Sequence, residues 1–84
     1  MTTVNTNVCN NFTASPNDTI DFTGYTIPCS ITKGDTTWPF TVASGFSLPH
    51  SSPIKIKASM VAGDYSFNVS CCEGQALKTV TVTT

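Results

Sequence analysis

Tyr65-Ser66-Phe67-Asn68-Val69 alternates apolar and polar residues, and this alternation decides the fold. A period of two is typical of a strand that has one buried face and one face in water. Ile54-Lys55-Ile56-Lys57-Ala58 repeats the pattern and sets both lysines toward water. The two stretches predict strands that pack their apolar faces into one core.

Further strand patterns recur at short intervals, separated by Gly, Pro, Asn and Ser. Because no window has the periodicity of a helix, we predict an all-β protein. The expected architecture is a small antiparallel Greek-key β-sandwich of six to seven strands, with residues 1–84 as a single domain. Residues 44–53 (SGFSLPHSSP) are expected to form the one long irregular loop. The other predicted strands cover residues 19–22, 26–32, 38–42, 77–82 and, more weakly, 4–8.

The chain has 84 residues, so its core is small and its stability marginal without a crosslink or a metal. Four cysteines are available for this purpose. An even number of cysteines in a short, turn-rich chain predicts two disulfides, and four cysteines allow three connectivities. Disulfides persist in oxidising compartments, so we expect a secreted or cell-surface protein. The four positions are Cys9, Cys29, Cys71 and Cys72.

The composition excludes several classes of partner. Ser and Thr supply 24 of the 84 residues, charged residues make up 11%, and the chain has no Arg. So few cations give a polyanion little to bind, and we expect no nucleic-acid partner. The net charge of −1 disfavours an anionic membrane surface. No stretch approaches the ~20 apolar residues of a membrane span, and we expect no membrane insertion.

Residue patterns that indicate catalysis are scarce. His50 is the single histidine, and it lies in a polar loop between Pro49 and Ser51. The acidic residues fall in turns or on outward strand positions, and the chain contains no glycine-rich phosphate loop. We therefore predict a protein that is not an enzyme and has no cofactor.

Two regions resemble plastocyanin-type cupredoxins. Gly63-Asp64-Tyr65-Ser66-Phe67, a glycine-containing loop and then Lys78-Thr79-Val80-Thr81-Val82 resemble the C-terminal, copper-binding end of that family. Upstream, Asn17-Asp18-Thr19-Ile20-Asp21-Phe22 resembles a family strand, and Ile27-Pro28-Cys29-Ser30-Ile31 resembles the segment that carries its first histidine ligand. The resemblance implies a cupredoxin-like sandwich, with an immunoglobulin-like sandwich as the alternative.

The copper ligands of that family are missing here. By the resemblance, Cys29 stands in place of the first histidine, Val69 in place of the copper-binding cysteine, Cys72 in place of the second histidine and Leu77 in place of the methionine. A type 1 copper centre requires two imidazoles and a thiolate. The resemblance therefore implies this fold without a copper site.

The same resemblance implies a disulfide. The two histidine ligands of the family meet at one metal ion, so cysteines at both positions come close together. It implies that Cys29 bonds Cys72, or Cys71 if the loop is shifted by one residue. The cysteine that remains in the loop then bonds Cys9.

Two other uses of these residues stay open. In a reducing compartment, Cys29, Cys71 and Cys72 could bind Cu(I) or Zn through thiolates. The apolar and aromatic residues in and near the irregular loop could instead form an exposed surface for a protein or a carbohydrate, although a tryptophan that covers one end of the core is the simpler interpretation. The residues of that surface are Trp38, Phe46, Leu48 and His50.

These observations predict a non-enzymatic binding or structural module that is stabilised by disulfides. A thiolate metal-binding protein is one alternative. Another is a self-assembling unit that pairs through the polar terminal strand at residues 77–84, an edge available to a neighbouring sheet. We expect a monomer or weak self-association.

Overall fold

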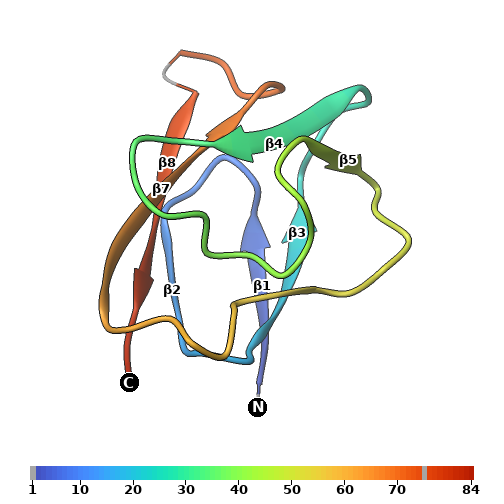
Figure 1. Ribbon diagram of the computed structural model, residues 1–84. Helices are drawn as coiled ribbons and strands as arrows, with labels where there is room; N and C mark the ends of the chain where they lie inside the picture. The colour runs from blue at the N-terminus through green and yellow to red at the C-terminus, as the bar shows by residue number, and fades with distance from the viewer. Residues whose placement is uncertain (1, 75) are drawn as a thin grey trace.

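The computed structural model describes residues 2–74 and 76–84, in which eight strands form two sheets and no helix occurs (Figure 1). This confirms the predicted all-β class and corrects the predicted six to seven strands. The first sheet has the order β1-β3-β6 and the second the order β2-β8-β7-β4-β5. The strands are β1 (Thr3–Asn7), β2 (Phe12–Ala14), β3 (Thr19–Thr23), β4 (Cys29–Lys33), β5 (Phe46–Leu48), β6 (Ile54–Lys55), β7 (Gly63–Val69) and β8 (Leu77–Val82).

Both sheets combine strands that are distant in sequence. β1 pairs with β3 in parallel and β2 pairs with β8 in parallel, whereas the other strand pairs are antiparallel. The sheets are therefore mixed, not purely antiparallel as predicted. β1 and β2 are consecutive in the chain but belong to different sheets, so the chain crosses between the sheets within its first 14 residues.

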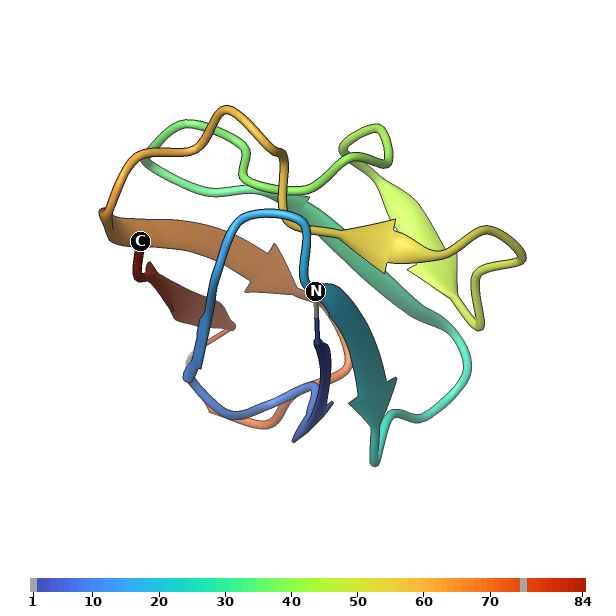
Figure 2. The same cartoon turned by 90° about the horizontal axis from the view of Figure 1, so that it is seen from below.

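The core lies between the two sheets and is rich in aromatic rings. Phe22 of β3 and Phe67 of β7 come from different sheets, and their ring centroids are 6.4 Å apart. Phe40, which precedes β5, contacts both rings and is completely buried. Figure 2 shows strands of both sheets arranged around this common interior. The buried face predicted for residues 65–69 is confirmed at Phe67 and Val69, which are fully buried, whereas Ser66 of the face predicted to be in water is buried as well.

Prolines shorten two of the predicted strands. Residues 38–42 form only one isolated bridge, between Phe40 and Ile56, because Pro39 has no N–H to donate to a ladder. The strand predicted over residues 26–32 begins instead at Cys29, directly after Pro28. Ile27, which falls within the predicted strand, is 74% exposed in the preceding loop.

Two short strands, β2 and β5, were not predicted from the sequence. β2 and β5 have three residues each, which is too short for an alternating pattern to stand out. β5 lies inside the region predicted as irregular, residues 44–53. Its pairing with β4 sets Phe46 and Leu48 inward.

The C-terminal strand is not a free edge. β8 pairs with β7 along Leu77–Val82, and its Val80–Val82 portion also pairs with β2. The alternative of assembly through residues 77–84 is therefore wrong for the Val80–Val82 portion, which β2 already covers. In the part of the chain that the structure describes, no helix has the length and apolar character to cross a membrane.

Candidate functional site

Two disulfides join the connection between β7 and β8 to earlier parts of the chain. Cys29 bonds Cys71, with Cα atoms 4.9 Å apart, and Cys9 bonds Cys72, with Cα atoms 5.6 Å apart. Of the two pairings implied by the resemblance, the structure contains the one shifted by a residue, and the pairing of Cys29 with Cys72 is wrong. Cys29 is the first residue of β4, and Cys9 lies in the turn that follows β1.

A hydroxyl network reinforces this end of the fold. The Ser30 amide donates to Ser70 Oγ at 2.8 Å, and the Ser70 amide donates to the Ser30 carbonyl oxygen at 3.0 Å. Both serines directly adjoin the cysteines of the Cys29–Cys71 bond. The disulfide therefore lies beside a two-way backbone and side-chain contact between β4 and the loop after β7.

The thiolate metal site does not form in this structure. Cys29, Cys71 and Cys72 are all bonded in disulfides, so none of them offers a free thiolate. Residues 2–74 and 76–84 contain no group of three or more His, Cys, Asp or Glu side chains that could hold a metal ion.

Most of the predicted interaction surface is buried. Trp38, Phe46 and Leu48 are 9%, 7% and 5% exposed, so they do not form an exposed patch. The Trp38 indole N–H donates to the Val42 carbonyl oxygen at 2.6 Å, which satisfies its one polar group inside the protein. The interpretation of Trp38 as part of the core is the one that the structure supports. Of the four predicted residues, only His50 remains half-exposed.

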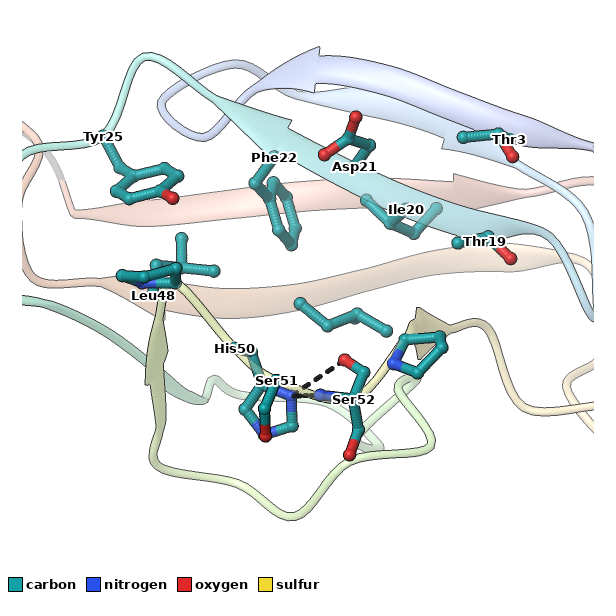
Figure 3. Close-up of a pocket in the computed structure, with 13 residues that line it drawn as sticks. Thr3, Thr19, Ile20, Asp21, Phe22, Tyr25, Leu48, His50, Ser51 and Ser52 are labelled. Atoms are coloured by element: carbon teal, nitrogen blue, oxygen red, sulfur yellow. Dashed lines mark hydrogen bonds between the residues drawn. The ribbon is translucent and has the colours of Figure 1, made fainter.

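A pocket of about 470 Å³ lies between β3 and the loop from β5 to β6 (Figure 3). Phe22 and Ile20 project from β3 toward this loop, whereas Asp21 projects from the opposite side of the strand. Tyr25 and Leu48 lie together at one end of the pocket. The complete lining is Thr3, Thr19, Ile20, Asp21, Phe22, Tyr25, Leu48, Pro49, His50, Ser51, Ser52, Pro53 and Ile54.

The pocket exists because β6 pairs with only part of β3. The register stops at the pair of Ile20 with Ile54. The next amide that would face β3, opposite Phe22, is that of Ser52, and it lies 3.3 Å from His50 Nδ1 instead. Backbone groups of successive strand residues point to opposite edges. The Thr23 carbonyl oxygen accepts from Val8 on the β1 side, so the N–H and C=O of Phe22 point to the pocket side.

The loop wall of the pocket turns away from the sheet at His50. The His50 Nδ1 atom lies 2.9 Å from the Ser52 carbonyl oxygen and 3.3 Å from the Ser52 amide nitrogen. One tautomer of the ring donates to the carbonyl and the other accepts from the amide, so either form closes the same tight turn. The ring also packs edge-on against Phe46, with centroids 5.3 Å apart.

The pocket lining contains one charged side chain, Asp21, and it points away from the loop wall. The rest of the lining combines apolar and aromatic side chains with the exposed loop serines Ser51 and Ser52. Of this site, the sequence predicted only Leu48 and His50. Tyr25 and Phe22 were missed as site residues because their proximity to the loop depends on the β3–β6 pairing, which no local pattern reveals.

No protein-family model matches the chain, and neither the curated proteins nor the solved structures contain a match to it.

Proposed function

We propose that the protein is a non-enzymatic binding module of an exported or cell-surface protein, with the β3–loop pocket as its ligand site. The pocket carries the proposal: about 470 Å³ is within the range of small-molecule sites, about 300–1,000 Å³. The two disulfides are compatible with an extracellular, oxidising location.

For the fold, we propose a Greek-key sandwich of cupredoxin-like type that lacks the copper ligands. The bond between Cys29 and Cys71 supports it, because it joins the two segments that resemble the histidine-bearing segments of that family. Val69, which takes the place of the copper-binding cysteine, is fully buried in the core. A disulfide then occupies the end of the sandwich where the family holds its metal.

The ligand that suits the pocket best is neutral and amphipathic, such as one or two sugar units. Sugar rings present C–H groups that pack on an aromatic face, and Tyr25 supplies a half-buried ring. Their hydroxyls can pair with the backbone N–H and C=O of Phe22, which point to the pocket side, and with the loop serines Ser51 and Ser52. The absence of a cation from the lining disfavours anionic ligands.

The proposal of no enzymatic activity is supported by the arrangement of ionisable groups in the pocket. His50 uses Nδ1 to close its own turn with Ser52. Asp21 is the one carboxylate in the lining, and it projects away from His50. Paired acid–base catalysis by these two residues would require both to reach the same reacting atoms.

The test is a titration with a panel of neutral mono- and disaccharides, followed by amide chemical shifts. We expect saturable shifts at Phe22, Tyr25 and Ser52. Tyr25→Ala should weaken binding by about three- to tenfold, because the loss of one aromatic contact lowers the binding free energy by that amount. Val61→Ala is the matched control, because Val61 is 70% exposed and does not line the pocket. Absence of shifts at these residues with every sugar would contradict the carbohydrate assignment and leave a protein partner as the alternative.

A further inference from the structure

The four sheet edges differ in how well they are protected against pairing with another chain. Among the described residues, β1 and β6 border the first sheet, and β2 and β5 border the second. Natural sheets protect their edges with short strands, prolines, charges or bulges. β2, β5 and β6 have only two or three residues, and each lies within two residues of a proline: Pro16, Pro49 and Pro53, respectively.

β1 has none of these protections. It has five residues, Thr3-Val4-Asn5-Thr6-Asn7, with no proline and no charged side chain. An uncharged strand of this length at a sheet edge offers a template for strand addition.

The hydrogen bonds of β1 show which backbone groups reach the open edge. Thr19 donates its amide to the Thr2 carbonyl oxygen at 2.8 Å, and the Val8 amide donates to the Thr23 carbonyl oxygen at 2.9 Å. Even-numbered residues of β1 therefore face β3. Because backbone groups alternate, Thr3, Asn5 and Asn7 direct their N–H and C=O groups to the open edge.

We propose that a second copy of this chain pairs with β1 in antiparallel orientation across a two-fold axis at Asn5. In this register Asn5 faces its own equivalent, Val4 faces Thr6 of the second copy, and Thr3 faces Asn7 of the second copy. The half-buried face then brings β-branched side chains together, and the exposed face brings amide and hydroxyl groups together. A two-fold axis makes the contact isologous, so it closes at a dimer.

The charge distribution favours a second copy as the occupant. The strand is uncharged and the whole chain has a net charge of −1, so two identical edges meet without like charges facing each other. The Asn7 carbonyl oxygen of the edge already accepts from the Asn10 amide at 3.0 Å and from the Thr6 hydroxyl at 3.3 Å. Because a carbonyl oxygen has two lone pairs, a bond from the Thr3 amide of the second copy would displace the exposed Thr6 hydroxyl. Because one five-residue strand per copy buries less than the ~1,200 Å² of a stable interface, the dimer should be weak.

Analytical ultracentrifugation over a range of protein concentrations tests the proposal. We expect the average mass of the unmodified chain to rise toward twice the monomer mass at millimolar concentration. Asn5→Lys should abolish this rise, because it places two ammonium groups opposite each other at the two-fold axis. Thr13→Lys is the matched control: it adds the same charge to an exposed position of the edge strand β2 and should leave the dimer intact.

Hydrogen exchange on the unmodified chain provides a measurement that needs no variant. The amides of Thr3 and Asn5 should become more protected as the concentration rises, while exposed amides elsewhere should not. A strictly monomeric chain at millimolar concentration would overturn the proposal. So would a dimer that survives Asn5→Lys or forms without protection at Thr3 and Asn5. Asn5 does not line the pocket, whereas Thr3 does, so the Asn5→Lys variant is the measurement that separates this proposal from the ligand proposal.

Discussion

Cys71 and Cys72 are adjacent in the chain, but they form disulfides with cysteines in two different parts of the fold. Cys71 reaches Cys29 at the start of β4, and Cys72 reaches Cys9 in the turn after β1. The connection between β7 and β8 is thereby anchored on two sides by consecutive residues. We therefore expect the two bonds to contribute unequally to the free energy of unfolding.

Removing either disulfide should destabilise the domain, but not equally. The Cys9–Cys72 bond spans 63 residues and the Cys29–Cys71 bond spans 42. In the chain-entropy model each is worth about 4 kcal/mol, with the longer loop slightly favoured. Cys29, however, is 1% exposed, so its replacement also removes core contacts. Urea unfolding should therefore show a larger loss for Cys29→Ala/Cys71→Ala than for Cys9→Ala/Cys72→Ala. The reverse order would mean that loop entropy outweighs packing at Cys29.

Single substitutions in the adjacent pair should release different thiols. Cys72→Ala should leave Cys9 free, and Cys71→Ala should leave Cys29 free. Labelling with a maleimide under denaturing, non-reducing conditions, followed by peptide mass analysis, identifies the released cysteine. Labelling of Cys29 in Cys72→Ala would show that the connectivity is exchanged.

Gly34 should not tolerate a side chain, because β7 approaches it closely. A Cβ atom at this position would lie 2.6 Å from Ser66 Oγ and 2.8 Å from the Ser66 carbonyl carbon. Gly34→Ala should therefore lower the free energy of unfolding by about 1–3 kcal/mol, as overpacking does. Ser66→Ala in the same chain should not restore stability, because the backbone of residue 66 is also in the way. Full recovery in the double variant would show that only the hydroxyl is crowded.

Asp18 should stabilise the N-terminal segment through its two carboxylate oxygens. Oδ1 accepts from the Thr2 amide at 3.1 Å, and Oδ2 accepts from the Ser15 amide at 2.9 Å. The side chain is 8% exposed, so its loss leaves donors without partners. We expect Asp18→Ala to cost about 1.5–3 kcal/mol, and Asp18→Asn less, because the amide retains one acceptor. Thermal unfolding measures the stability of both variants. Equal losses of stability would contradict the role of the two carboxylate oxygens as separate hydrogen-bond acceptors.

Side-chain alternation predicted the strands that carry the core but not the irregular parts of the fold. Phe67 and Val69 were placed correctly because a strand with one buried face imposes a period of two. Ile27 matched the same period but lies in a loop, because the following Pro28 delays β4. Phe46 and Leu48 were predicted to form an exposed surface, although their strand has only three residues and faces inward.

The candidate site was less predictable than the core for a physical reason. Phe22 and His50 are far apart in sequence, and they line the same pocket only because β6 stops pairing with β3 at Ile54. Sequence patterns report which face of a strand is buried, but not where its neighbour ends. The resemblance to cupredoxins left two possible partners for Cys29, which are the adjacent residues Cys71 and Cys72. The structure contains the bond to Cys71.

The adjacency of Cys71 and Cys72 also bears on how this protein can change over evolutionary time. Surface loops usually accept insertions and deletions. Here one residue added or lost just before Cys71 would shift both sulfur atoms along the chain and misdirect them from Cys29 and Cys9. We expect descendants of this chain to vary in loop length after Cys72 and to preserve it between Val69 and Cys72.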